Sequence, residues 1–245
     1  EMIAQKLRLK KGMHVLDLGC GWGGLARYLA KNYGVSVTGI TISKEQAIYA
    51  QNRVPRELSV KIHAMDYRDA PKLGKFDRVT SIGLTEHIGP KNYRVYMEKA
   101  RQSVKKNGLF LLHTIGAAES FPNRDHSEIM WMDKHIFPNF VIPSLSQIMK
   151  AAEGLFVVED VHNFGADYDP TLMAWNERFK KSWPKLRETI PLFKEMTSEQ
   201  KEEFYRMWTY YLGICAGGFR ARNMYELWQI PLSPQGIPGG YSAPR

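Results

Sequence analysis

One stretch of this chain constrains its fold more than any other: "VLDLGCGWGG", residues 15–24. A short apolar run, typical of a buried strand, leads into Gly19, Gly21, Gly23 and Gly24, and the helix-like "GLARYLAKNY" follows at once. Glycine lets a backbone turn sharply and approach a ligand closely, and the N-terminus of the next helix then faces that ligand. The stretch therefore predicts a strand, a ligand-binding turn and a helix.

The same alternation of strand and helix continues along the chain. Seven apolar runs predict strands, at 14–20, 35–41, 59–66, 76–84, 109–116, 155–165 and 226–233. Helical patterns lie between them at 24–33, from about Lys44, and at 91–108, and Ser43 with Gln46 fits a capping box at the second of these helices. This order predicts an α/β fold with a doubly wound, mostly parallel seven-stranded sheet.

Two segments break the alternation. Residues 117–144 are rich in proline, asparagine and aromatic side chains and show no periodicity. Residues 171–225 form the most aromatic part of the chain, with amphipathic helices predicted at 171–183 and 200–220. Long insertions in a compact domain are usually lids or binding elements, so we expect one domain over residues 1–245 that carries both segments as insertions.

Composition narrows the class of protein. The net charge of +9 suits an anionic partner, either nucleic acid or an anionic membrane face, or simply solubility. The chain has no arginine-rich tract or RNP-type motif, so we expect no nucleic-acid partner. Cys20 and Cys215 form no CxxC pair, which fits a reducing, intracellular setting. The sequence begins "EMIAQKL", without an initiator Met and inside a predicted helix, so we expect the natural N-terminus to lie upstream.

The glycine-rich turn fits two nucleotide-binding templates. Gly19-x-Gly21-x-x-Gly24 is the dinucleotide fingerprint, and the series that starts at Asp17 and runs through Gly19, Gly21 and Gly23 is the turn of S-adenosylmethionine (SAM) methyltransferases. A nicotinamide-binding fold places an acid at the end of the second strand to hold the ribose. That strand ends "GITIS" without an acid, which favours SAM.

Five further stretches together carry a family resemblance. They are "GMHVLDLGCGWGGLARYLAKNYGVSVTGITISKEQ", "SIGLTEHIGPKNY", "FLLHTIG", "HNFGADYDPTLMAW" and "YYLGICAGGFRARNMYELWQ". In this order, and across nearly the whole chain, they resemble the cyclopropane-fatty-acyl-phospholipid synthases, to which the mycolic acid cyclopropane synthases are more distantly related. The resemblance implies a Rossmann-like class I SAM-dependent methyltransferase that adds the SAM methyl group to a cis double bond of an unsaturated phospholipid and closes a cyclopropane ring.

The resemblance also assigns the cofactor-binding residues. Gly19, Cys20 and Gly21 would face the methionine end of SAM, Gln46 the ribose, and Asp66 with Tyr67 the adenine. The full set that we carry over is Asp17, Gly19, Cys20, Gly21, Gly23, Thr41, Ile42, Gln46, Asp66 and Tyr67.

The chemistry that the resemblance implies needs a base in a dry pocket. Attack of an alkene on the sulfonium methyl leaves a cation that must lose a proton, and water would trap this cation as an alcohol. The resemblance makes a bound bicarbonate the base, held by Glu86, His113, the backbone of Ile115, and Tyr168. A carboxylate beside an anion needs a proton on one of the two, so we expect a raised pKa at Glu86.

Each of these residues also has a structural interpretation. Glu86 and His87 can simply start a helix, His113 can be a hydrogen-bonded core histidine, and Tyr168 can be a packing residue. The spacing of Glu86, His87 and His113 matches no zinc pattern. Cys215 is a catalytic candidate by resemblance, but it lies on an apolar helical stripe, and we favour a buried small hydrophobe there.

The aromatic insertion leaves two interpretations open. Trp175, Phe179, Trp208 and Tyr211 can line an acyl-chain tunnel or belong to the core, and Lys180, Lys181, Lys185 and Arg187 can meet lipid headgroups or be a solvated helix face. The resemblance further implies a cytoplasmic protein at the inner face of the membrane, and it leaves a homodimer open. By resemblance, full-length bacterial members carry an N-terminal domain ahead of "EMIAQKL", and we expect this chain to be the catalytic domain without it. The alternatives are an N-methyltransferase of a small tertiary amine and a non-catalytic SAM-binding module.

Overall fold

The computed structural model of the chain describes residues 1–120 and 127–245. Residues 121–126, which are part of the predicted 117–144 insertion, lie outside the described residues. The chain divides into two compact units. The first comprises residues 1–116, 140–163 and 228–245, and the second comprises residues 117–139 and 164–227.

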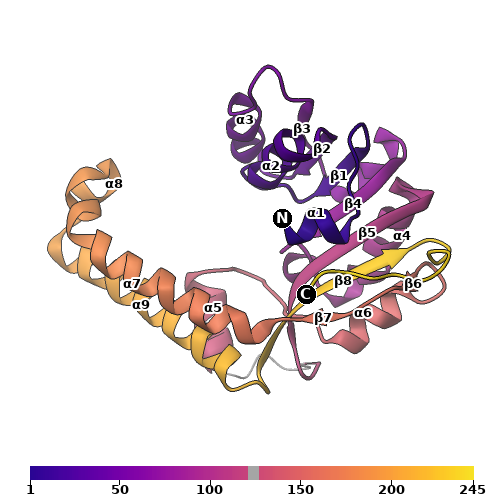
Figure 1. Ribbon diagram of the computed structural model, residues 1–245. Helices are drawn as coiled ribbons and strands as arrows, with labels where there is room; N and C mark the ends of the chain where they lie inside the picture. Colours follow the sequence, from indigo (N-terminus) through magenta and orange to yellow (C-terminus); the bar gives the residue numbers. More distant parts are fainter. Residues whose placement is uncertain (121–126) are drawn as a thin grey trace. The chain divides into compact units, whose positions relative to one another are not determined.

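An eight-stranded sheet forms the centre of the first unit (Figure 1). Its strands are β1 (His14–Leu18), β2 (Ser36–Thr41), β3 (Val60–Ala64), β4 (Phe76–Ile82), β5 (Val104–Ala117), β6 (Val157–Val158), β7 (His162–Asn163) and β8 (Tyr225–Ser233). The order is β3-β2-β1-β4-β5-β8-β6, with β7 also paired to β8. Strands β1 to β5 are parallel, which confirms the predicted doubly wound α/β fold.

The predicted number of seven strands is wrong because the run 155–165 is not one strand. Val158 pairs with Leu232 and His162 pairs with Gln229, so the register shifts by one residue between them, although the Glu159 N–H still donates to the Pro231 carbonyl at 3.0 Å. Pro231 lies opposite this shift, and a proline has no N–H to donate to a ladder. Two short antiparallel strands, β6 and β7, therefore stand where the sequence predicts a single strand.

A second boundary also differs from its prediction. The helix expected at 91–108 ends early, as α4 (Tyr93–Ser103), and β5 begins at Val104. Val104 pairs with Phe76, and the register then shifts at a bulge before Arg78. Val104 is fully buried, so contacts across the sheet outweigh the helical pattern of the local sequence.

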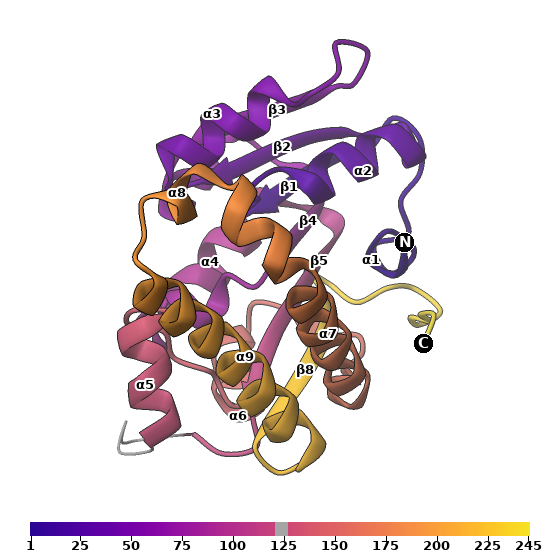
Figure 2. The same ribbon diagram turned by 90° about the vertical axis from the view of Figure 1, so that its left-hand side faces the viewer.

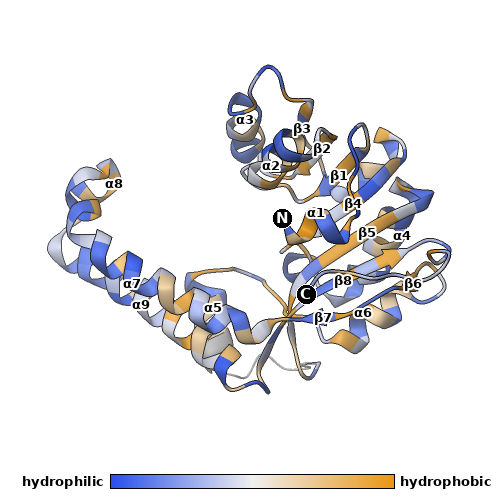
Figure 3. Cartoon of the chain, viewed as in Figure 1, coloured by the Kyte–Doolittle hydropathy of each residue, from blue (hydrophilic) through white to orange (hydrophobic). Residues whose placement is uncertain are grey.

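The pleat of the sheet separates two hydrophobic cores. Successive residues of a strand point to opposite faces, so Val15 packs with the helix α2 (Gly24–Tyr33), whereas Leu16 packs with α4 and α6 (Leu145–Ala152). Figure 2 shows the sheet with its helices from a second direction. In Figure 3 the central strand β5 is largely hydrophobic, while α3 (Lys44–Asn52) is largely hydrophilic. The short helix α1 (Met2–Lys6) buries Ala4 and Lys6.

The second unit is helical. It contains α5 (Ser127–His135), α7 (Gly165–Thr189), α8 (Pro191–Lys194) and α9 (Ser198–Arg220), and α7 packs along α9 (Figures 1 and 2). The ring of Trp183 packs on those of Phe193 and Phe204, with centroids 5.0 and 5.6 Å away. No described helix is long and apolar enough to span a membrane.

The helix predicted at 171–183 extends further at both ends. Pro170 and Pro184, which bound the prediction, both lie inside α7. A proline inside a helix removes one backbone hydrogen bond, and here packing of α7 along α9 compensates for that loss. Local proline rules therefore give the wrong ends for this helix.

Gly116→Ala tests the tight packing of β5 against β8. A Cβ atom at this position would lie 2.0 Å from Cζ3 of Trp228, a ring that is almost completely buried. We expect the free energy of unfolding in urea to fall by about 1–3 kcal/mol or more, because a buried ring must move. Gly213→Ala is the control, since no atom lies within 4 Å of its Cβ and the residue is helical. An equal loss in both variants would contradict this interpretation.

Candidate functional site

A cavity of 570 Å³ lies at the carboxyl ends of β1, β2, β3 and β4. In a doubly wound sheet this edge is where ligands bind, because the loops after adjacent parallel strands meet there. Seven of the predicted cofactor residues line the cavity: Gly19, Gly21, Thr41, Ile42, Gln46, Asp66 and Tyr67. The structure thus brings these predicted residues together from three separate segments of the chain.

The glycine-rich turn takes the backbone conformation that its sequence predicts. Gly19, Gly21 and Gly23 have φ angles of 79°, 51° and 71°, a region that other residues rarely adopt. No atom lies within 4 Å of the position of a Cβ on Gly21, whereas a Cβ on Gly23 would meet Ala50 at 2.8 Å. The turn therefore approaches α3 closely at Gly23 and leaves open space beside Gly21.

The side chain of Gln46 is oriented from the end of β2. Thr41 Oγ1 donates a hydrogen bond to Gln46 Oε1 at 2.8 Å. Ser43 caps α3 by accepting from the Gln46 backbone N–H at 3.1 Å, but Gln46 does not bond back to Ser43, so only half of the predicted capping box forms. Among the described residues the Nε2 group of Gln46 has no hydrogen-bond partner, which leaves a donor at the wall of the cavity.

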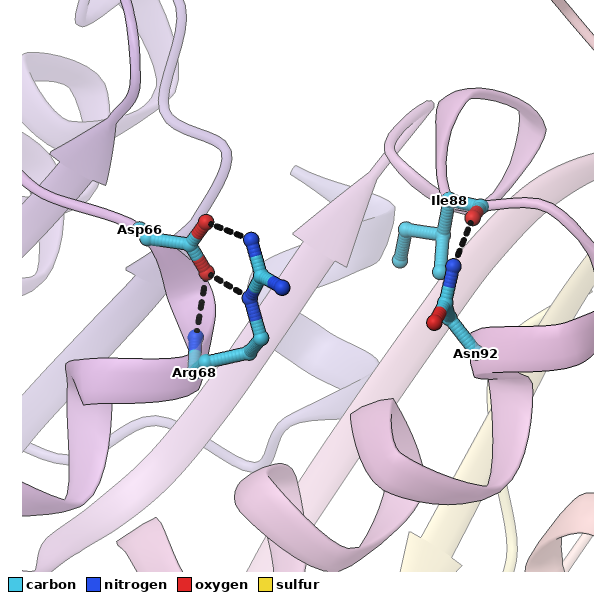
Figure 4. Close-up of polar contacts among 4 residues, drawn as sticks. All are labelled: Asp66, Arg68, Ile88 and Asn92. Atoms are coloured by element: carbon cyan, nitrogen blue, oxygen red, sulfur yellow. Dashed lines mark hydrogen bonds and ion pairs between the residues drawn. The ribbon is translucent and has the colours of Figure 1, made fainter.

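Two polar pairs contribute residues to the lining of the same cavity (Figure 4). Arg68 donates from Nε and Nη2 to the two oxygens of Asp66, at 2.9 and 2.6 Å. This hydrogen bonding lowers the pKa of Asp66, so the carboxyl is ionised near neutral pH. Asn92 donates to the Ile88 carbonyl at 2.9 Å, which fixes the loop after β4.

The sequence did not predict about half of the residues that line this cavity. Residues between β4 and α4 line the cavity at Ile82, Gly83, Leu84, His87, Ile88 and Asn92, and Met65 and Arg68 do so beside Asp66. The sequence leaves His87 between a functional and a structural interpretation, and its position in the cavity wall favours the former. The signal was the adjacency of β1 and β4, which the strand order of a doubly wound sheet predicts.

Asp17 and Cys20 are not among the lining residues. Asp17 is 2% exposed, and burial raises its pKa to about 7. Burial, followed by the charge of Asp17, raises the pKa of the Cys20 thiol to about 12. The backbone N–H groups of Gly19 and Cys20 both donate to the Ile40 carbonyl, at 3.0 and 2.8 Å. These contacts hold the turn against β2, and direct contact of Asp17 and Cys20 with a cofactor stays a prediction.

Glu86 is a buried carboxyl in a short 3₁₀ turn after β4 (Thr85–His87). It is 8% exposed, and its Oε1 accepts a hydrogen bond from the Ile115 backbone N–H at 2.7 Å. The buried Oε2 has no hydrogen-bond partner among the described residues. Desolvation raises the pKa of this carboxyl, in the direction expected from the sequence. The predicted pair of Glu86 and Ile115 is thus in direct contact.

His113 lies two residues before Ile115 on β5. Its Nδ1 lies 3.2 Å from Nε2 of Gln229 on β8. Burial lowers the pKa of His113 to about 4, so the ring is neutral near pH 7. Sequence reasoning missed Gln229, although an amide in the apolar run "ELWQIPLS" was the available signal.

Tyr168 and Cys215 belong to the second unit. The ring of Tyr168 packs edge-on against Phe219 and Trp175, with centroids 5.0 and 5.8 Å away. The Cys215 thiol is buried, which raises its pKa to about 11 and keeps it protonated near neutral pH. That state favours the interpretation of Cys215 as a small buried hydrophobe.

The second unit also contains a groove of 880 Å³. Its walls come from α5, α7 and α9 and include Trp131, Asn176, Lys180, Met207 and Tyr210. The four aromatic residues predicted for an acyl tunnel are not among its lining residues. Asn176 is 6% exposed, and its Oδ1 has no partner among the described residues.

Comparison with known proteins identifies the family. The model of mycolic acid cyclopropane synthetase matches residues 1–230. The chain belongs to this family. Cyclopropane-fatty-acyl-phospholipid synthase of Escherichia coli strain K12 is 50% identical over 245 residues, which cover 100% of this chain and 59% of that protein.

Solved structures agree with the family assignment. The cyclopropane synthase MmaA2 from Mycobacterium tuberculosis is similar with a TM-score of 0.78 and 26% identity, over 93% of this chain and 80% of that one. Mycolic acid cyclopropane synthase CmaA1, complexed with SAH and CTAB, gives a TM-score of 0.75, 26% identity and the same coverage. The chain thus spans about three fifths of the length of the E. coli relative (59%) and most of the mycobacterial ones.

Asp17→Asn tests the burial of the carboxyl at the end of β1. The folded pKa of Asp17 is raised, so folded protein holds a proton that the unfolded chain releases between about pH 4 and 7. Its stabilising contribution is complete below pH 4 and is lost as the pH rises through 7, and the slope over this range is about 1.4 kcal/mol for each pH unit. We expect the stability of Asp17→Asn relative to wild type to increase between pH 4 and 7 and then level off. Urea unfolding of both proteins measures it, and a difference that does not change with pH would rule it out.

Proposed function

We propose that this protein transfers the methyl group of SAM to the cis double bond of an unsaturated phospholipid acyl chain and closes a cyclopropane ring, with a bound bicarbonate as the base. The observation that carries the proposal is Glu86, a buried carboxyl with a raised pKa and an unpartnered Oε2, in a chain of the cyclopropane synthetase family. Methylation of a tertiary amine releases no proton and needs no base, whereas closure of the ring on a methylated alkene must remove a proton.

The cavity at the sheet edge suits SAM in size and in its polar groups. Ligand sites of this kind range from about 300 to 1,000 Å³, and this one measures 570 Å³. The Nε2 group of Gln46 offers a donor to ribose oxygens, and the open space beside Gly21 admits a chain at the turn. When bound, SAM supplies the electrophilic methyl and bicarbonate accepts the proton lost on ring closure.

Glu86 has the properties needed to hold an anion. A raised pKa makes protonation of this carboxyl easier, and a proton on Oε2 would turn that oxygen into a donor. Oε1 stays occupied by the Ile115 N–H, so the carboxyl cannot rotate freely. The Ile115 N–H is therefore used by Glu86, and in the proposal Ile115 acts through that contact.

His113 and Tyr168 complete the proposed set. The neutral His113 ring adds no charge that would attract water into the site. Tyr168 would contribute a phenol donor. Exclusion of water is the main requirement, since a cation formed on the acyl chain reacts with any water present.

Two features support a lipid substrate. The groove in the second unit offers Trp131, Met207 and Tyr210 to an acyl chain, and the charged residues Lys180, Glu203 and Arg206 also line it. The net charge of +9 suits an anionic membrane face, so we propose peripheral contact with the inner leaflet. The cytoplasmic location and the association of two copies belong to the same proposal.

The decisive experiment uses SAM labelled in its methyl group and vesicles of phospholipids with cis-monounsaturated chains. We expect label in the acyl chains and a gain of one methylene per converted chain by mass spectrometry. Vesicles with fully saturated chains are the control. Label found in a soluble amine, or SAM binding without transfer to lipid, would replace this proposal by one of its two alternatives.

Glu86→Gln tests the proposed anion holder. An amide keeps the size of the side chain but cannot exchange a proton with a bound anion, so we expect the rate of transfer to fall about 10²-fold or more. SAM affinity should stay within a factor of about two. Glu98→Gln, at a surface carboxyl paired with Arg94 at 3.1 Å, is the matched control. Removal of dissolved carbon dioxide should slow the wild type and not the Glu86 variant, and equal slowing of both would disprove the role.

Gln46→Leu tests the cofactor cavity. The change removes the Nε2 donor and the bond to Thr41, so we expect SAM to bind about 10-fold more weakly by calorimetry. The transfer rate at saturating SAM should change little. Gln102→Leu, at an exposed position of α4, is the control, and unchanged affinity in the Gln46 variant would contradict the assignment.

A further inference from the structure

Gln229 is a buried amide beside a predicted catalytic side chain. It lies in β8 with 4% of its surface exposed, between the fully buried apolar residues Trp228 and Ile230. Strand alternation points it to the opposite face from those two side chains. A buried amide destabilises the fold unless it forms hydrogen bonds, and the partner of its Nε2 is Nδ1 of His113, at 3.2 Å.

We propose that Gln229 is a positioning residue that holds His113 as the neutral tautomer with its proton on Nε2. With Nε2 of the amide facing it, Nδ1 is the acceptor and carries no proton, because an amide nitrogen only donates; Oε1 of Gln229 has no partner among the described residues. A neutral imidazole has one donor and one acceptor, which places the remaining proton on Nε2. This inference rests on the proposed function, in which His113 offers a donor to the bound anion.

The surroundings of His113 favour the same state. Burial lowers its pKa to about 4, and the charge of Lys6 acts in the same direction. A second proton on the ring would have to sit on Nδ1, where it would face the Gln229 amide hydrogens. The geometry and the charges therefore agree.

Further polar residues lie between Gln229 and the helix α1. His162 on β7 is its register partner, and His162 Nδ1 lies 2.6 Å from Nζ of Lys6. Lys6 is fully buried, and desolvation lowers its pKa to about 8, with Asp160 and Arg245 acting on it in opposite directions. Lys6, His162, Asp160 and Arg245 are thus charged or titratable groups on this side of the sheet, and the experiment must separate the effect of Gln229 from theirs.

Nitrogen-15 NMR of the purified protein reads the tautomer directly. The signals are assigned by their loss in His113→Gln. We expect the Nε2–H form in wild type, without titration above about pH 5. Gln229→Glu places a carboxylate opposite Nδ1, so the proton should move to Nδ1 and the pKa of His113 should rise by at least about one unit. Gln229→Met, similar in size but without a donor, should give a mixture of tautomers.

Kinetics on unsaturated vesicles test whether the tautomer matters. In both Gln229 variants we expect kcat to fall at least about 10-fold, because a wrong tautomer disables a histidine that must offer a proton donor. The KM for SAM should stay within a factor of about two. Gln51→Met is the control: it removes a 2.8 Å bond to the Ile62 backbone, far along the sheet at β3, and should change neither tautomer nor kcat.

Three outcomes overturn the proposal. They are an Nδ1–H tautomer in wild type, unchanged tautomers in both Gln229 variants, and unchanged kcat despite a reversed tautomer. Failure of the proposed function is distinguishable from these. In that case wild type transfers no label to lipid, but its spectra still show His113 with the proton on Nε2. The spectra of Gln229→Glu still show the higher pKa of His113, and the structural role of Gln229 remains supported.

Discussion

The parallel pairing of β1 with β2 and β4 is the constraint on which the candidate site depends. Parallel neighbours end at the same edge of the sheet, so the turns after them must meet there. The glycine-rich turn, the Thr41–Gln46 segment and the loop before α4 lie far apart in sequence, yet they line one cavity for this reason. Asp66 and Tyr67 follow β3, whose parallel pairing with β2 brings them to the same edge.

Three carboxyls near this edge of the sheet differ in burial and in pKa. Asp17 ends β1 and Glu86 follows β4, and desolvation raises the pKa of both. Asp66, by contrast, is paired with Arg68 at the cavity wall and has a lowered pKa. Burial thus raises the pKa of the two interior carboxyls, and pairing with Arg68 lowers that of Asp66, which solvent reaches. Glu86 has a buried oxygen without a hydrogen-bond partner among the described residues, and the proposed chemistry centres on this oxygen.

The sequence predicted the cavity better than it predicted the chain's exact elements. Glycines at Gly19 and Gly21 and the cap at Ser43 are local signals, and each acts within a few residues of where it is read. The errors arose where distant contacts decide. Pro231 interrupts a ladder that the run 155–165 would otherwise complete, and Val104 joins the sheet because Phe76 offers a partner. The amide in the apolar run "ELWQIPLS" marks Gln229 as unusual, but only the fold shows that its partner is His113.

The sequence by itself determined the α/β class, the glycine-rich turn and the family, because periodicity, glycine spacing and ordered motifs are properties of the linear chain. Only the tertiary structure decided which groups meet: Glu86 with the Ile115 backbone, and His113 with Gln229. It also decided which of these groups are buried away from water. Protonation and tautomeric state depend on burial and on neighbours from other strands, and neither quantity can be read from local sequence.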